Sequence, residues 1–323
     1  MERVGGGQSS GAGSQVGSRL LGSDPPRAGC EPARVLGSAS KRKANLAWTS
    51  YAQNAEDVRL RRAFAGQATG FYIDVGANHP VTFSLTKHFY DSGWSGINVE
   101  PLPAQYERIR AARPRDTTLN VGCSSQAGTL TLYEALGGVS GMSTFTLEEV
   151  AEHRQKGFEF REVSCPVLTL ASICEEHAAG RTIDFMSVDV EGHEASVLAG
   201  ADFERFRPRV IVVEATRPNS TEPTHERWES LIVNHGYLFA VFDGLNRYYV
   251  RREDEALVPA LSLPPNVFDD YVPFIYQRRI ELLESRLAEA SLLGRLKKPV
   301  VSVKRAAHKL RRWVEARRSG GGA

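Results

Sequence analysis

The chain has 323 residues and a net charge of +2, and this charge is unevenly distributed. Residues 295–323 contribute +9 and residues 1–47 contribute +4, so residues 48–294 carry a net charge of −11. An acidic body of this kind argues against a nucleic-acid substrate, because neutralising phosphates requires a basic face.

Residues 1–47 are rich in Gly, Ser, Ala and Arg and show no periodic apolar pattern, so we expect this segment to be disordered. It lacks the apolar core of a signal peptide, and no later stretch approaches the roughly 18 apolar residues of a membrane span. The four cysteines, Cys30, Cys123, Cys165 and Cys174, form no C-x-x-C pair and indicate neither a zinc site nor a disulfide framework. These features predict a cytoplasmic protein with reduced cysteines.

The segment Phe71–Pro80 predicts a buried strand followed by a tight turn. Its first five residues are mostly aromatic and β-branched, enough for one strand and too few for a helix. Gly76 and Asn78 tolerate the positive φ that a sharp turn at the strand end requires. A second apolar run ends at Glu100, 26 residues after Asp74. In open α/β sheets, an acidic side chain in this second position accepts hydrogen bonds from ribose hydroxyls.

The residues of this turn discriminate between classes of nucleotide cofactor. A dinucleotide site prefers G-x-G-x-x-G, whose glycines admit a pyrophosphate onto a helix N-terminus. This chain has Asn78 at the second glycine position, and Asp74 stands where its charge would repel phosphate. An aminoacyl sulfonium has no phosphate and carries an ammonium group that a carboxylate attracts. The turn therefore favours S-adenosylmethionine, and a strand-to-helix turn without a ligand is the alternative interpretation.

Strand-like and helix-like segments alternate along residues 48–272, as expected for a mostly parallel, doubly wound α/β sheet. Five parallel strands are predicted at 71–75, 96–99, 117–121, 183–188 and 209–214. Helices are predicted at 83–92, 103–112, 147–155, 170–177, 194–199 and 225–235. The turn-rich tetrad 243–246 lies between the apolar runs 237–242 and 247–250, which predicts a final antiparallel hairpin.

A second group of polar residues follows the strand predicted at 183–188. This strand delivers Asp189, Glu191 and His193 to the edge where the first strand also ends, and Gly192 interrupts the strand so that the three can converge. Methyl transfer to a hydroxyl requires in-line placement and a base, and His193 or a carboxylate could accept the proton. The same set could instead bind a divalent metal, or its acidic residues could cap the next helix.

Glu214 ends a nearly all-apolar strand at the same rim. A carboxylate in this position is costly unless a partner compensates for its burial. We expect Glu214 either to hold the acceptor or orient His193, or to form an ion pair with Arg217. Acceptor specificity should depend on the loops 137–145 and 217–224, the first of which is either a lid or a flexible surface loop.

Two further segments follow residue 272. Residues 273–294 predict an amphipathic helix that packs on the body or on a second subunit. Its apolar positions recur every three or four residues, at Tyr276, Ile280, Leu283, Leu287 and Ala290. Residues 295–323 form a basic tail with a second apolar stripe, which fits either a solvated tail or a contact with an anionic membrane surface.

Four segments, in the correct order, resemble the FkbM-type methyltransferases: Ser50–Asp57, Phe71–Asn78, Gly93–Pro101 and Ser187–Glu194. The likeness covers roughly residues 50–272. It implies a class I, Rossmann-like methyltransferase fold that uses S-adenosylmethionine, usually to methylate an oxygen on a sugar or a secondary metabolite.

The resemblance also implies roles for individual residues. Asp74, Gly76 and Asn78 would line the methionine end of the cofactor, and Glu100 would bind its ribose. The acceptor would be bordered by Asp189, Glu191 and His193. Two departures from the family pattern, His79-Pro80 after Asn78 and Ser187 before the second acidic group, concern the acceptor rather than the cofactor.

The sequence therefore predicts a single-domain, S-adenosylmethionine-dependent O-methyltransferase that acts on a sugar hydroxyl of a glycan, a polysaccharide precursor or a glycosylated metabolite. We expect His193, Asp189, Glu191 and Glu214 to be catalytic and assign no metal ligands. Expected partners are a small-molecule or carbohydrate acceptor, a second copy of the chain, and an inner membrane face touched by the basic tail. The alternatives are a nicotinamide-dependent sugar oxidoreductase, opposed by the missing glycine pattern, and a non-catalytic cofactor-binding scaffold, opposed by the number of carboxylates at one rim.

Overall fold

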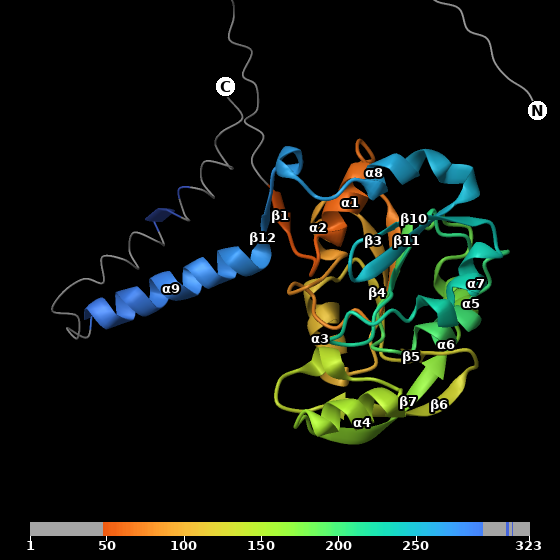
Figure 1. Ribbon diagram of the computed structural model, residues 1–323, viewed down its shortest axis with the longest axis horizontal. Helices are drawn as coiled ribbons and strands as arrows, with labels where there is room; N and C mark the ends of the chain where they lie inside the picture. The colour runs from red at the N-terminus through yellow and green to blue at the C-terminus, as the bar shows by residue number, and fades with distance from the viewer. Residues whose placement is uncertain (1–47, 293–307, 310–311, 313–323) are drawn as a thin grey trace, which may run out of the picture. The chain divides into compact units, whose positions relative to one another are not determined.

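The computed structural model describes residues 48–292, 308, 309 and 312 (Figure 1). The segment 1–47, predicted to be disordered, and almost all of the basic tail 295–323 lie outside these residues. In the described part of the chain, no helix is long and apolar enough to cross a membrane.

A seven-stranded mixed sheet forms the centre of the fold, in the order β10-β11-β9-β8-β2-β3-β4. Its strands are β2 (Phe71–Val75), β3 (Ser95–Val99), β4 (Thr117–Leu119), β8 (Phe185–Val188), β9 (Val210–Glu214), β10 (Tyr237–Phe242) and β11 (Asn246–Arg251). The first five run parallel, and β11 pairs antiparallel with both β9 and β10. An α/β fold is therefore confirmed, and each of these strands begins and ends within two residues of its predicted bounds.

The central strands β2, β8 and β9 are mostly apolar because both faces of the sheet are covered by helices (Figure 1). Alternate residues of a strand point to opposite faces, so Ile73 of β2 lies in one core and its neighbour Tyr72 lies in the other. The first core includes side chains of α5 (Leu170–His177), α6 (Glu194–Ala199) and α7 (Glu229–Val233). The second includes side chains of α1 (Glu56–Ala63), α2 (Lys87–Asp91) and α8 (Val258–Ser262).

Of the six helices predicted within residues 48–272, four are found as predicted and two differ, and α1 and α8 were not predicted. The bounds of α3 (Pro103–Ala112), α4 (Leu147–Gln155), α5 and α6 are as predicted. The helix predicted at 83–92 is reduced to α2, because Phe83 has a left-handed φ of 59°, which no α-helix accommodates. The helix predicted at 225–235 divides into a 3₁₀ turn, His225–Arg227, and α7, because Trp228 between them has a non-helical φ of −141°.

Two small sheets were not predicted. One has the order β5-β7-β6, formed by β5 (Gly122–Cys123), β6 (Gly128–Ala135) and β7 (Phe160–Leu168). The other pairs β1 (Trp48–Ser50) in parallel with β12 (Tyr271–Pro273), two segments more than 200 residues apart. This pairing brings the beginning and the end of the described domain together.

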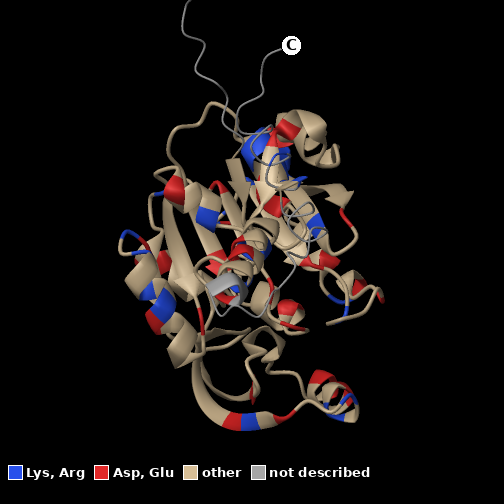
Figure 2. Cartoon of the chain, turned by 90° about the vertical axis from the view of Figure 1, so that its left-hand side faces the viewer, with Lys and Arg blue, Asp and Glu red and all other residues tan. Residues whose placement is uncertain are grey.

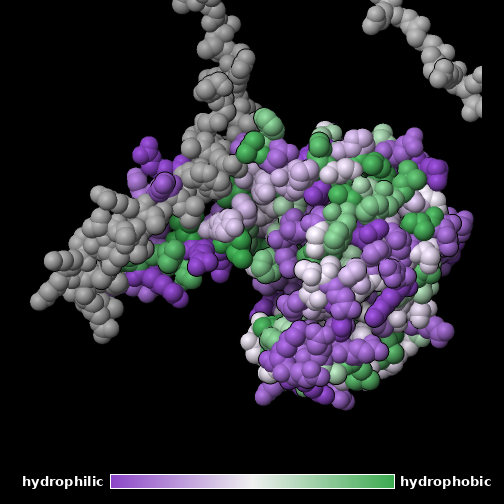
Figure 3. Space-filling model, viewed as in Figure 1, coloured by the Kyte–Doolittle hydropathy of each residue, from purple (hydrophilic) through white to green (hydrophobic). Residues whose placement is uncertain are grey.

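Helix α9 (Phe274–Leu292) confirms the helix predicted at 273–294 over residues 274–292. Ile280 packs against Val272 of β12 and is buried, whereas Tyr276 and Leu283 of the same stripe are 52% and 37% exposed. Hydrophobic side chains accordingly reach the surface along this helix (Figure 3).

Charged residues of both signs stand side by side on the helices (Figure 2). In α4, for example, Lys156 follows the last turn and forms an ion pair of 2.7 Å with Glu152. Solvent screens opposite charges at an exposed helix surface, so such pairs stabilise a helix only weakly.

Candidate active site

The candidate active site is a cavity of about 590 Å³ at the carboxyl ends of the parallel strands. Because β2, β3, β8 and β9 are parallel, the residues that follow them meet at one edge of the sheet. Seven of the eight site residues predicted from the sequence line this cavity. They are Asp74, Gly76, Asn78, Glu100, Asp189, Glu191 and Glu214.

The turn after β2 is shaped by Gly76, which has a φ of 86°. A Cβ atom at this position would lie 1.8 Å from the backbone oxygen of Asp189, so the turns after β2 and β8 approach each other too closely for any side chain. Asn78 also has a positive φ, 47°, and its Oδ1 accepts a hydrogen bond of 3.0 Å from Ser140. The sequence therefore correctly predicted where the chain needs left-handed backbone, and only Gly76 needs it for close packing.

Glu100 is held in place by backbone groups. Its Oε2 accepts a hydrogen bond of 2.7 Å from the Asn78 N–H, and its Oε1 accepts one of 2.8 Å from the Leu102 N–H. Each carboxylate oxygen keeps a second lone pair for a ligand. Burial nevertheless raises the pKa of Glu100 to about 7, because desolvation outweighs the two backbone hydrogen bonds.

Asp74 lies on a buried chain of hydrogen bonds that the sequence did not reveal. Its Oδ2 accepts a bond of 2.7 Å from the Thr86 hydroxyl, which in turn accepts a bond of 2.6 Å from the guanidinium of Arg113. Arg113 is 1% exposed and also donates to the backbone oxygen of Pro80 at 2.7 Å. Burial raises the pKa of Asp74. An arginine just after a helix looks like a surface residue, so no sequence signal marked Arg113.

Three carboxyl groups form an acidic cluster at the rim: Asp189, Glu191 and Glu214. Desolvation is the largest cause that raises the pKa of each. The Asp189 side chain is exposed to the cavity that it lines. Because protein atoms surround this cavity, the carboxyl group is still desolvated. The neighbouring Asp189 carboxyl adds to the raised pKa of Glu214, and the Oε2 atom of Glu214 has no hydrogen-bond partner.

The ion pair considered between Glu214 and Arg217 does not form. Arg217 instead contacts Glu149 at 3.1 Å and Glu152 at 2.6 Å. Glu194, for which helix capping was the alternative role, accepts backbone hydrogen bonds from Gly192 at 3.0 Å and from Val190 at 3.3 Å. This carboxylate therefore fixes the loop that carries the acidic cluster.

His193 is the one predicted site residue that does not line the cavity. It is the residue before α6, and its Nε2 lies 3.2 Å from the hydroxyl of Ser124. Its ring centroid lies 5.4 Å from that of Phe145, which does line the cavity. Burial lowers the pKa of His193, which favours the neutral imidazole. Asp189, Glu191 and His193 therefore do not converge on one pocket. The chain turns at Glu191 and Gly192, both with positive φ, and His193 after this turn is not part of the cavity lining.

Both loops expected to determine specificity line the cavity, with residues that include Ser140 and Phe145 of the first and Asn219 of the second. Sequence reasoning missed the remaining wall, which comes from Gln53, Glu56, Phe83 and Asn246 among others. Among the residues that the structure describes, no three His, Cys, Asp or Glu side chains are arranged to hold a metal ion.

Solved structures with slight similarity to this chain include three methyltransferases. The TehB-like SAM-dependent methyltransferase of Corynebacterium glutamicum is 10% identical, covers 61% of this chain and 88% of its own, and has a TM-score of 0.34. The B. subtilis M1A22 tRNA methyltransferase TrmK is 10% identical over 80% of this chain and 95% of its own, with a TM-score of 0.30. The StiE O-MT, residues 961–1257, is 10% identical over 68% and 82%, with a TM-score of 0.31. TM-scores this low do not indicate a shared function.

No curated protein matches the chain. The model of one protein family does, and its description is the methyltransferase FkbM domain. The match extends from residue 74 to residue 239, from the acidic residue of β2 to the hairpin, and so spans half of the chain and most of the cavity lining. The chain belongs to the FkbM methyltransferase family, and its methyl donor is S-adenosylmethionine.

Proposed function

We propose that this methyltransferase modifies a sugar hydroxyl on a glycan, a polysaccharide precursor or a glycosylated metabolite. The observation that carries the proposal is the charge of the cavity lining. Six carboxyl groups line it, and no Lys, Arg or His does so among the described residues. Whether these carboxyl groups are ionised or neutral, the described lining offers no cationic side chain to pair with a phosphate or carboxylate acceptor. An uncharged acceptor rich in hydroxyl groups suits this lining best.

The uncharged polar side chains of the lining support the same class of acceptor. Asn219, Ser220 and Thr221 come from one specificity loop, and Asn246 comes from the start of β11. Amide and hydroxyl groups both donate and accept hydrogen bonds, as the hydroxyls of a sugar do. Family membership removes the nicotinamide-dependent alternative, and turnover distinguishes an enzyme from a non-catalytic scaffold.

The lining residues also match the chemistry of the methyl donor. Leu102, Leu132 and Phe145 offer an apolar surface for a purine ring. The free lone pairs of Glu100 accept hydrogen bonds from ribose hydroxyls, and Asp74 attracts the ammonium group. S-adenosylmethionine supplies an electrophilic methyl group on a positively charged sulfur.

We assign the proton acceptor to the acidic cluster rather than to His193. The pKa values of Asp189 and Glu214 are both raised, and repulsion between two neighbouring carboxylates favours a single proton on the pair, which leaves one carboxylate to accept the proton of the acceptor hydroxyl. A raised pKa makes this carboxylate a stronger base near neutral pH. His193 is assigned a positioning role, in which its contact with Ser124 steadies the loop before α6.

Transfer of tritium-labelled methyl groups to a panel of neutral sugars tests the proposal. Asp189→Asn should lower kcat by about 10² or more, and His193→Ala by less than about threefold. Calorimetry with S-adenosylhomocysteine should give similar affinities for wild type and Asp189→Asn. Transfer only to non-sugar acceptors would overturn the sugar assignment, and a large loss confined to His193→Ala would return the base to the histidine.

A further inference from the structure

A second cavity of about 330 Å³ lies beside the active site. Gln53, Thr82 and Phe83 line both cavities, so the two are neighbours with a common wall. We call the second one the aromatic cavity. Its volume lies within the range of small-ligand sites, roughly 300–1,000 Å³.

The lining of the aromatic cavity differs in chemistry from that of the active site. No charged side chain lines it among the described residues, whereas six carboxyl groups line the active site. Its aromatic rings are Tyr51, Phe83, Tyr271, Phe274 and Tyr276, and its amide side chains are Gln53 and Asn54. Aromatic faces with a few polar groups fit a ligand whose rings are apolar on their faces and polar at their edges. Neutral sugar rings have this character.

Phe83, in the common wall, shows a departure from relaxed backbone geometry. Its φ is 59°, which is rare and unfavourable for a bulky residue. The side chain is also 50% exposed, so burial of its ring does not explain the conformation. A β-bridge between Ala52 and Phe83 holds the backbone in place. Strained residues cluster at ligand sites, where the surrounding structure imposes the geometry.

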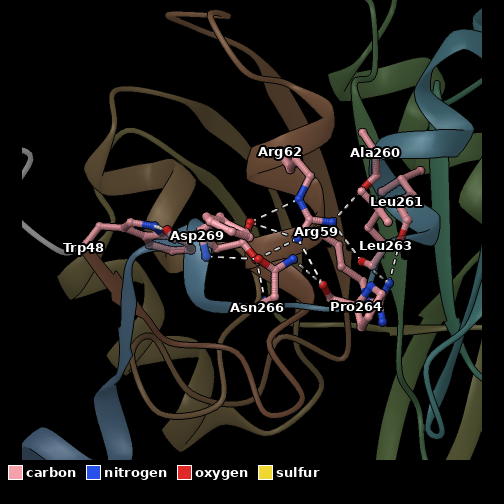
Figure 4. Close-up of polar contacts among 10 residues, drawn as sticks. Trp48, Arg59, Arg62, Ala260, Leu261, Leu263, Pro264, Asn266 and Asp269 are labelled. Atoms are coloured by element: carbon pink, nitrogen blue, oxygen red, sulfur yellow. Dashed lines mark hydrogen bonds and ion pairs between the residues drawn. The ribbon is translucent and has the colours of Figure 1, made fainter. Parts of the chain in front are cut away.

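The lining that comes from residues 265–276 adjoins a dense polar network that anchors this part of the chain to α1 (Figure 4). Arg62 donates to both carboxylate oxygens of Asp269, at 2.9 and 2.7 Å, and Arg59 donates to the backbone oxygen of Leu261 at 2.6 Å. The indole of Trp48 donates to the backbone oxygen of Asp269 at 2.9 Å. Just beyond this network, β12 pairs with β1 and leads into the first turn of α9. The aromatic wall is therefore fixed by the fold before any ligand binds.

We propose that the aromatic cavity binds the sugar residues next to the one that is methylated, so that the acceptor is a neutral oligosaccharide rather than a single sugar. This inference rests on the proposed function. The two cavities share a wall at Phe83, so one oligosaccharide can occupy both at once. Because no charged side chain among the described residues lines the aromatic cavity, neutral sugars fit it better than anionic ones.

Tyr276→Ala is the test variant, because Tyr276 lines only the aromatic cavity and is 52% exposed. Phe268→Ala is the matched control, because Phe268 is an exposed aromatic that lines neither cavity. Methyl transfer by the full chain is measured with neutral di- to tetrasaccharides, each paired with the methyl glycoside of its terminal sugar. We expect kcat/KM to favour oligosaccharides at least tenfold in wild type and Phe268→Ala. Tyr276→Ala should lose most of this preference with the monosaccharide rate unchanged.

Saturation-transfer NMR on the same sugars reports binding without turnover. Contact signals should extend beyond the terminal sugar in wild type and shrink to it in Tyr276→Ala. Equal rates with single sugars and oligosaccharides, or a preference unaffected by Tyr276→Ala, would refute the aromatic cavity as a sugar site and leave the proposed function standing. A Tyr276-dependent preference for alkyl glycosides instead would assign the cavity to an apolar aglycone. Methyl transfer to no sugar, with no contact signals, would refute both proposals.

Discussion

Glu100 makes the stability of the protein depend on pH in a direction opposite to that of an ordinary salt-bridged carboxylate. Its folded-state pKa is about 7, against 4.5 for the free group, because burial disfavours the charged form. Below pH 4.5 the carboxyl is protonated in both states, and its contribution to stability is fully present. As pH rises through 7 the folded protein must also ionise, and the contribution is lost. A shift of this size corresponds to about 3 kcal/mol.

Glu100→Gln tests this reasoning because it removes the titration. The amide has one acceptor oxygen, so one of the N–H groups of Asn78 and Leu102 loses its partner, at a pH-independent loss of about 1–3 kcal/mol. The informative quantity is therefore the pH dependence of the difference between variant and wild type. Between pH 4.5 and pH 8 the free energy of unfolding of wild type should fall relative to the variant by about 3 kcal/mol.

The assay is urea denaturation at half-unit steps of pH, followed by tryptophan fluorescence. Glu56 and Glu194, whose pKa values are raised by burial to about 8 and about 7, titrate in both proteins and cancel in the difference. A difference that stays constant from pH 4.5 to pH 8 would show that Glu100 ionises normally in the fold. In that case its two backbone hydrogen bonds outweigh desolvation, and the raised pKa is wrong.

Three further outcomes follow from the structure. Gly76→Ala should abolish S-adenosylhomocysteine binding in calorimetry and destabilise the fold by about 2 kcal/mol or more, because its Cβ would overlap the Asp189 backbone; unchanged binding would contradict the close approach. Arg113→Leu should cost about 3–5 kcal/mol in the same denaturation assay, since it strips a buried network, whereas Arg110→Leu, at an exposed ion pair, should leave the free energy of unfolding nearly unchanged. S-adenosylhomocysteine at 100 times its Kd should stabilise wild type by about 2.7 kcal/mol and NAD should not, as thermal unfolding would show.

The sheet was predictable where burial is simple. Strands such as β8 and β9 are covered on both faces, so they appear in the sequence as short apolar runs between polar turns. Strand β6 was missed because its first four residues are exposed, and such a strand lacks a continuous apolar signal. The helix predicted at 83–92 failed for another reason. Its residue types allow a helix, and only tertiary contacts hold Phe83 in a left-handed conformation.

The sequence predicted those site residues whose position depends only on the strand that carries them. A carboxylate in the last two residues of an apolar strand, or directly after it, reaches the common edge, and Asp74, Glu100, Asp189 and Glu214 all do. His193 lies beyond a two-residue turn with positive φ, so its direction depends on backbone angles that residue types do not specify. The aromatic cavity is still less accessible to sequence reasoning, because its walls come from residues near 51, 83 and 274.

The pairing of β1 with β12 explains how residues far apart in the sequence come to line the aromatic cavity. Pairing of β1 with β12 places the start of the domain against its end, beside the turn that carries Phe83. The ion pair between Arg62 and Asp269 stabilises the β1–β12 pairing independently of the central sheet. The residues that we propose to bind the methyl donor lie at the carboxyl edge of the sheet, and those that we propose to bind the rest of the acceptor lie around the β1–β12 pair. Substitutions around the β1–β12 pair can then change which acceptors are used without disturbing the residues that bind the donor.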